Sequence, residues 1–277
     1  MKHLEGIFKG GRLNLYYQGW LPDSEPRAIV AVVHGLAEHS GRYANLAGHL
    51  VPLGYAVYGL DHQGHGLSPG LRCYIESFSH LLDDLDVFLE LVRQRHPGKP
   101  LFIIGHSVGA TIAAAFLSRR PGDGISGFIS SAVSLKPGKG ISPLHIAVAR
   151  LLSKVAPRMP VSSLNSATIS RDAGVVKAYQ EDPLVYQGKI RARTGDELLK
   201  TMRGLPAELE RLGVPLLVLH GGGDRLIDPD SSRLLYEGAG SEDKTLKLYL
   251  GFYHEVLNEP GRQQVLKDIE KWLEAHL

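Results

Sequence analysis

Short apolar runs alternate with stretches of helical periodicity along most of this sequence. The apolar runs occupy residues 28–34, 55–60, 101–105, 127–132, 215–220 and, more weakly, 245–250. Continuous apolar character is typical of strands that are buried on both faces of a sheet. The helix-period stretches lie at residues 43–53, 79–95, 108–119, 231–238 and 261–277. Strands that alternate with helices predict an α/β fold with a mostly parallel, doubly wound sheet.

The alternation breaks between residues 135 and 205. This interval of about seventy residues is too long for one loop of a compact domain, so we expect it to fold as an inserted helical cap. The sequence then predicts a first part of the α/β core at 1–134, the cap at 135–205 and the second part of the core at 206–277. Near the N-terminus, residues 13–18 alternate with period two, which predicts a half-exposed antiparallel strand.

Composition excludes several classes of protein. The 277 residues are 43% apolar, which rules out a disordered chain, and 31 basic against 29 acidic residues leave a formal charge of +2. Long runs of one charge sign are absent from the sequence, so we expect no nucleic-acid partner and no polybasic membrane patch. The single cysteine, Cys73, and the lack of a signal-like or membrane-spanning apolar stretch favour the cytosol.

A Gly-x-Ser-x-Gly motif stands where a predicted strand meets a predicted helix, as Gly105-His106-Ser107-Val108-Gly109. This is the context of a nucleophile elbow, in which the serine takes a strained turn and the glycines let strand and helix pass closely. The motif alone is common, and a plain strand-to-helix turn is the alternative. We expect Ser107 to be a nucleophile, with the Val108 N–H facing a developing oxyanion.

A serine nucleophile needs an imidazole base that is oriented by a carboxylate. On a fold of this kind the order along the chain is Ser, then Asp or Glu, then His, each after a strand. Asp224 follows one buried strand and His254 the next, so we predict them as acid and base. Asp228 and Asp230 are rival carboxylates, although their place is more typical of caps for the following helix. The other late histidine, His276, belongs to the terminal helix.

A second oxyanion donor is expected from the loop that follows the strand at 28–34. Because Gly35 gives access there, the N–H of Leu36 is the predicted partner of the N–H of Val108. The His and Glu residues of this loop and of residues 61–66 match no zinc motif, and the glycine-rich stretches lack a nucleotide-binding frame. We therefore expect no metal and no cofactor.

Several stretches, the elbow among them, match one known family, and those of the first loop and of the cap are more specific than the elbow alone. The matching stretches are His34-Gly35, Glu38-His39-Ser40-Gly41-Arg42-Tyr43, Asp61-His62, Gly64-His65-Gly66 with Ser68, Gly105-His106-Ser107, Ser170-Arg171, Tyr179, Asp182-Pro183-Leu184, Asp224-Arg225-Leu226 and Tyr253-His254. On these residues the chain resembles the monoacylglycerol lipase branch of the α/β-hydrolases. Ala37 and Ala110 replace glycines that are common in that family. The residues after His254 differ from those of mammalian members, which indicates a microbial relative.

The resemblance implies an α/β-hydrolase fold and a serine ester hydrolase that cleaves monoacylglycerols to fatty acid and glycerol. The residues it implies are Ser107, Asp224 and His254 for the triad, Leu36 and Val108 for the oxyanion hole, and Glu38, Arg42 and Tyr179 for the glycerol end of the substrate. The alternatives are a lysophospholipase, a general carboxylesterase of short or medium-chain esters and, from a different class, a non-catalytic binding protein of this fold.

Apolar residues of the predicted cap fall on one helical face: Ile141, Leu144, Val148, Leu151, Leu152 and Val155. Ordinary packing against the core is one interpretation of this face. The other is that the helix lines an acyl-chain tunnel and rests on a membrane surface. A small lipid ester is the expected partner. The sequence leaves the oligomeric state open.

Overall fold

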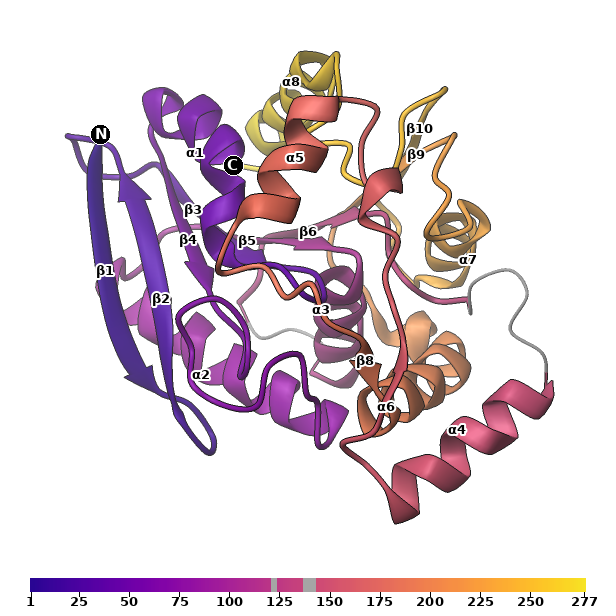
Figure 1. Ribbon diagram of the computed structural model, residues 1–277. Coiled ribbons are helices and arrows are strands. Elements are labelled where there is room, and N and C mark those ends of the chain that lie inside the picture. The colour runs from indigo at the N-terminus through magenta and orange to yellow at the C-terminus, as the bar shows by residue number, and fades with distance from the viewer. Residues whose placement is uncertain (121–123, 137–142) are drawn as a thin grey trace.

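The computed structural model describes residues 1–120, 124–136 and 143–277 (Figure 1). Among these residues, eight strands form a sheet in the order β1-β2-β4-β3-β5-β6-β9-β10. They are β1 (Lys2–Lys9), β2 (Asn14–Leu21), β3 (Ala28–Val33), β4 (Tyr55–Leu60), β5 (Leu101–His106), β6 (Gly127–Ser131), β9 (Leu216–Gly221) and β10 (Lys244–Tyr249). Neighbours from β4 to β10 pair in parallel, whereas β2 is antiparallel to both β1 and β4. The predicted mostly parallel, doubly wound sheet is confirmed.

Helices cover both faces of this sheet (Figure 1). One face packs against α1 (Ala44–Leu50) and α8 (Arg262–Ala275), and the other against α2 (Phe78–Arg95), α3 (Val108–Arg119) and α7 (Asp230–Gly238). The predicted helix at 43–53 is divided, because the 3-10 turns η1 (Ser40–Tyr43) and η2 (Val51–Leu53) flank α1.

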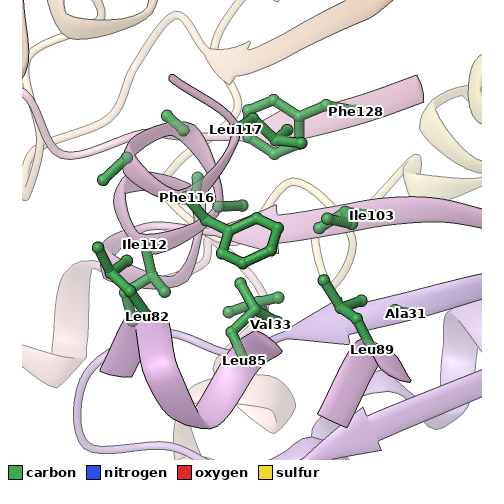
Figure 2. Close-up of a cluster of buried hydrophobic side chains, with 14 of the residues drawn as sticks. Ala31, Val33, Leu82, Leu85, Leu89, Ile103, Ile112, Phe116, Leu117 and Phe128 are labelled. Carbon is green, nitrogen blue, oxygen red and sulfur yellow. The ribbon is translucent and has the colours of Figure 1, made fainter. Parts of the chain in front are cut away.

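Successive residues of a buried strand supply opposite faces of the core. In β3, Ile29 and Ala31 face the helices α2 and α3, while Val30 lies in the cluster with α1 and α8. Figure 2 shows the first of these clusters, with the ring of Phe116 from α3 among side chains of α2 and the sheet. Burial of one such large apolar side chain contributes about 1.5–3 kcal/mol. Packing on both faces fixes the carboxyl ends of the parallel strands, where ligands bind in sheets of this type.

The N-terminal hairpin departs from the expectation. The sequence pattern gave no sign of β1, because its residues are mostly exposed or half-buried and only Phe8 is buried. β2 is more buried than a half-exposed strand, since β1 and β4 pair with its two edges. Its polar Gln18 is buried and donates a hydrogen bond to Ser40 Oγ at 2.8 Å. The alternation therefore predicted the strand correctly but not its burial.

The chain between β6 and β9 holds most of the remaining elements. They are α4 (Pro143–Val155), β7 (Pro160–Ser162), η3 (Ser166–Thr168), α5 (Ala173–Glu181), β8 (Ile190–Arg191), α6 (Ala192–Gly204) and η4 (Leu205–Arg211). We call residues 135–205 the inserted segment; its two boundaries remain a prediction. The helix α4 packs against α6 at the periphery of the molecule (Figure 1). Of the predicted apolar face, Ile141 and the side chain of Leu144 lie outside the described residues.

Candidate active site

Ser107 occupies a tight turn between β5 and α3. Its backbone has φ 53° and ψ −119°, a region that is costly for any residue with a side chain. The turn is held by a hydrogen bond from Ser107 N–H to Ser131 O at 2.8 Å. An added Cβ on Gly105 would lie 2.6 Å from Ala110 Cα, and one on Gly109 would lie 2.0 Å from Val33 O. Both glycines are therefore required by close backbone approach, as expected of a nucleophile elbow.

Asp224 lies in the loop after β9 and accepts four hydrogen bonds. Its Oδ1 receives the backbone N–H groups of Leu226 at 2.8 Å and Ile227 at 3.0 Å. Its Oδ2 lies 2.7 Å from Nδ1 of His254 and 2.9 Å from Nε2 of His220. The rival Asp228 instead accepts the N–H of Asp230 at 3.1 Å, at the start of α7. Of the candidate carboxylates, the structure thus brings Asp224 to His254.

His254 reaches this carboxylate because its loop crosses closely over the end of β9. A Cβ on Gly221 would lie 2.0 Å from Tyr253 O, so only a glycine fits there. A carboxylate accepts hydrogen bonds and cannot donate them, so Nδ1 of His254 carries the proton. In the neutral ring Nε2 then keeps a lone pair, which is the form that a general base requires.

The electrostatics of the pair follow from burial and charge. Burial acts to lower the pKa of His254, but the Asp224 carboxylate outweighs it, and the pKa of His254 is raised above its ordinary value. Burial acts to raise the pKa of Asp224, yet the His254 ring and the hydrogen bonds from His220 and His254 hold that pKa well below its usual range. Asp224 is therefore ionised at neutral pH.

Ser107 and His254 line one cavity of about 240 Å³. Leu36, Val108 and Leu226 lie on its wall together with residues of the inserted segment. The apolar members of the lining are Leu36, Val108, Leu164, Ile169, Ile190, Leu198, Met202, Leu226 and Ile227. Of the described α4 side chains, at 147–155, none lines this cavity. The expectation that this helix lines a tunnel is therefore not met by its described side chains, and the apolar lining comes from the core and from other parts of the inserted segment.

The loop with Leu36 runs close to the nucleophile. A Cβ on Gly35 would lie 3.3 Å from Ser107 Cβ and 2.9 Å from Glu38 Oε1. Ala37, which stands where the family commonly has glycine, has φ 69°, in the left-handed region. The inserted segment fixes this loop, because Tyr186 N–H donates to Ala37 O at 2.8 Å. Val108 begins α3, so its N–H is one of the helix-end donors without an acceptor inside the helix.

Of the three residues implied for the glycerol end, Glu38 and Tyr179 line the cavity and Arg42 lines a neighbouring one. Glu38 Oε1 accepts the Gly35 N–H at 2.6 Å. Arg42 donates two hydrogen bonds to Glu255, at 2.9 and 2.7 Å, and its guanidinium lies 4.5 Å from the ring centre of Tyr179. The guanidinium is thus engaged by protein groups, and Arg42 as a substrate contact remains a prediction.

Three site residues escaped the sequence interpretation. His220 is the second partner of Asp224, and Glu255 is the partner of Arg42 and lines both cavities. His106 lies with its ring centre 4.7 Å from that of His254. Burial, then the charge of His254, lowers the pKa of His106, so its ring is neutral. The only signal for these three was adjacency in sequence to a strand end or to a predicted triad residue.

The histidines in and beside the loop after β3 differ in their ring contacts: the rings of His34 and His39 form hydrogen bonds, whereas both ring nitrogens of His62 are buried without a partner among the described residues. His34 donates from Nδ1 to Gly35 O at 2.7 Å and accepts the His62 N–H at Nε2 at 2.9 Å. His39 bonds Asp182 of the inserted segment at 3.0 Å. Burial lowers the pKa of His62 to about 3 and that of His65 to about 4. Within the described ranges, no group of three His, Cys, Asp or Glu side chains is arranged to hold a metal ion.

Comparison with known proteins agrees with this geometry. Residues 24–261 match the family described as "Serine aminopeptidase, S33", and the chain belongs to this family of α/β-hydrolases. It is 40% identical over 274 residues to the monoacylglycerol lipase of Mycolicibacterium smegmatis, covering 99% of this chain and 98% of that one. It is 34% identical over 261 residues to human monoglyceride lipase, covering 94% and 86%.

A solved structure shows the same relationship. The crystal structure of Paleococcus ferrophilus monoacylglycerol lipase is 33% identical and superposes with a TM-score of 0.85, covering 95% of this chain and 99% of that one. The chain is thus a microbial-type member of the monoacylglycerol lipase branch, and both the predicted resemblance and the α/β-hydrolase fold are confirmed. Within the described residues, no helix is long and apolar enough to span a bilayer.

Proposed function

We propose that this protein is a carboxylic ester hydrolase that cleaves monoacylglycerols to fatty acid and glycerol. The observation that carries the proposal is the 2.7 Å contact between Asp224 Oδ2 and His254 Nδ1, with His254 on the same cavity as Ser107. The names of the relatives with which the chain shares 40% and 34% identity support the substrate class.

The reaction uses the three residues in fixed roles. Ser107 Oγ attacks the ester carbonyl while Nε2 of His254 takes the hydroxyl proton. Asp224 holds the ring and stabilises the imidazolium. The backbone N–H groups of Leu36 and Val108 bind the tetrahedral oxyanion. Collapse of this intermediate releases glycerol, which receives the proton from His254, and leaves the acyl group on Ser107. A water molecule then attacks the acyl-enzyme by the same proton transfers and frees the fatty acid.

The cavity suits a substrate with one apolar chain and a small polar end. Its apolar wall would hold the acyl chain, while the buried Glu38 and Glu255 offer carboxylate oxygens to hydroxyl groups near His254. No step requires a metal or cofactor. In this proposal the inserted segment acts as the cap that closes the cavity, since Ile169, Tyr179 and Leu198 belong to its lining.

A panel of substrates tests the assignment. Turnover should be highest on long-chain monoacylglycerols, and Ser107→Ala should lower kcat by several orders of magnitude, toward about 10⁶-fold. A preference for lysophospholipids, or for short-chain p-nitrophenyl esters over monoacylglycerols, would favour the lysophospholipase or carboxylesterase alternative. Absence of turnover on every ester would favour a binding protein of this fold.

Peripheral membrane contact is part of the proposal. Val148, Leu151 and Val155 of α4 are 47%, 60% and 69% exposed, so this apolar face meets solvent. Leu164 of the inserted segment is also exposed and lines the cavity, so apolar surface of this segment reaches the site. The sequence has no acidic residue from 137 to 171, and Arg150 and Lys154 of α4 are basic. We infer that this face docks on an anionic lipid surface from which the substrate enters.

Vesicle flotation tests the docking. The double variant Leu151→Asn/Val155→Asn should lose partitioning onto anionic vesicles. The control Leu250→Asn alters a leucine that is 94% exposed beside β10 and should partition like the unaltered protein. Equal loss in both variants, or in neither, contradicts docking through α4. The cytosolic location expected from cysteine usage remains a prediction.

A further inference from the structure

His220 is buried in the sheet next to the carboxylate that holds His254. It is completely buried in β9 and makes two short hydrogen-bond contacts. Its Nε2 lies 2.9 Å from Asp224 Oδ2, and its Nδ1 lies 2.7 Å from Oγ of Ser232 on α7. Asp224 Oδ2 therefore stands between two imidazole rings, since Nδ1 of His254 approaches it at 2.7 Å.

For a neutral His220 ring, the chemistry of the partners gives the direction of each hydrogen bond in this series. Asp224 is ionised and accepts only, so Nε2 of His220 must carry a proton. A neutral imidazole that donates from Nε2 presents a lone pair at Nδ1, and the Ser232 hydroxyl donates to it. The bonds thus run from Ser232 to His220 to Asp224, and from the other side from His254 to Asp224. The Asp224 carboxylate then accepts a hydrogen bond from each of its four N–H partners.

We propose that His220 is a positioning residue of the active site, which orients Asp224 and shares its Oδ2 with His254. The Leu226 and Ile227 N–H groups hold only Oδ1. Without His220, the bond to His254 would be the one side-chain contact on Oδ2 among those described. The His220 N–H also draws off part of the negative charge of Oδ2, so it moderates how strongly Asp224 holds a proton on His254. This inference rests on the proposed function only for its kinetic consequences.

Two replacements separate this role from simple packing. Gln places its amide nitrogen near the position of His Nε2, so His220→Gln keeps a donor for Asp224. Asn places its amide near the position of His Nδ1, so His220→Asn keeps a partner for Ser232 but does not reach Asp224. A residue that only fills space between β9 and α7 would show similar effects for both variants, or a larger one for Gln.

The direct measurement is the pKa of His254 by NMR titration of its ring, which does not depend on turnover. The groups that face His254 are Asp224, Glu255, Glu38 and His106, with Arg42 paired to Glu255 behind them, and none of these residues is altered. In His220→Asn, Oδ2 loses a donor and holds the His254 proton more strongly, so this pKa should rise by up to about one unit. In His220→Gln it should return toward the original value. An unchanged or lowered pKa in His220→Asn, or equal shifts in both variants, overturns the proposal.

Ester hydrolysis supplies the second readout. In His220→Asn the acid limb of the kcat/KM profile should move up in pH with the NMR value, and kcat at neutral pH should fall about tenfold with little change in KM. Fluorophosphonate titration of active sites corrects both variants for any unfolded fraction. If the NMR shift occurs while the unaltered protein hydrolyses no ester, the positioning of Asp224 stands and the proposed function fails. If the unaltered protein hydrolyses esters and the acid limb does not move in His220→Asn, the proposed function stands and the positioning role of His220 fails.

Discussion

Replacement of Asp224 by asparagine should leave the site assembled and nearly inactive. The backbone N–H groups of Leu226 and Ile227 donate to Oδ1 of Asp224, so the amide oxygen of asparagine takes that place. The amide NH₂ must then face His254 and His220, where Oδ2 was. Because an NH₂ group donates, Nδ1 of His254 becomes an acceptor and its proton moves to Nε2. The ring then presents a proton to Ser107 instead of a lone pair.

The size of the effect follows from this change of tautomer. A general base with no lone pair toward the nucleophile cannot take its proton, and the equivalent replacement in another Ser-His-Asp site lowers kcat about 10⁴-fold. This corresponds to about 5 kcal/mol of barrier. The variant should stay folded, because asparagine keeps the backbone contacts and the shape of the side chain.

Steady-state hydrolysis of a monoacylglycerol at pH 8 measures the loss, with a thermal melt to confirm folding. The matched control is Asp228→Asn, which alters the contact to the Asp230 N–H at the start of α7 and should cost at most a few-fold in kcat. A larger loss for Asp228→Asn, or activity of Asp224→Asn within tenfold of the unaltered protein, refutes the assignment of the acid.

Four further outcomes are expected. Because the pKa of His254 is raised, the midpoint of the acid limb of the kcat/KM profile should lie above pH 6.5. The base works only when neutral, so activity falls as the pH drops through the pKa of His254. Ala37→Gly removes left-handed strain at φ 69° and should raise the free energy of unfolding by up to about 1 kcal/mol in urea titration. Ala110→Gly, inside α3, should instead lower it by about 1 kcal/mol. Phe116→Ala should cost about 3–5 kcal/mol, because the ring is buried between sheet and helices (Figure 2). Opposite signs in any of these comparisons contradict the local reasoning.

Most of the site was predicted from the positions at which the buried strands end. Buried strands are continuous apolar runs, so their ends were visible, and the polar residues that follow them converge at one edge of a parallel sheet. That rule brought the loops of Asp224 and His254 together but left Asp228 and Asp230 as rivals, and the loop geometry selects Asp224. β1 was missed because an edge strand with Phe8 as its one buried side chain has no apolar signature.

Long-range pairing of polar groups was beyond the sequence pattern. Arg42 and Glu255 are 213 positions apart, and no local periodicity links a charge to so distant a partner. In the sequence, His220 is only the last residue of an apolar strand. Its contact with Asp224 depends on the conformation of the loop that follows β9. In α4 the periodicity predicted the helix but not whether its apolar face is covered, and Val148, Leu151 and Val155 are exposed.

Fluorophosphonate labelling with peptide mapping tests the central claim most directly. The protein should take up one label per chain at Ser107, and hydrolysis of a monoacylglycerol should fall in proportion to the labelled fraction. His254→Ala should label far more slowly, since the serine then lacks its base. A label on another serine, or monoacylglycerol hydrolysis that persists when Ser107 is fully labelled, would contradict the account.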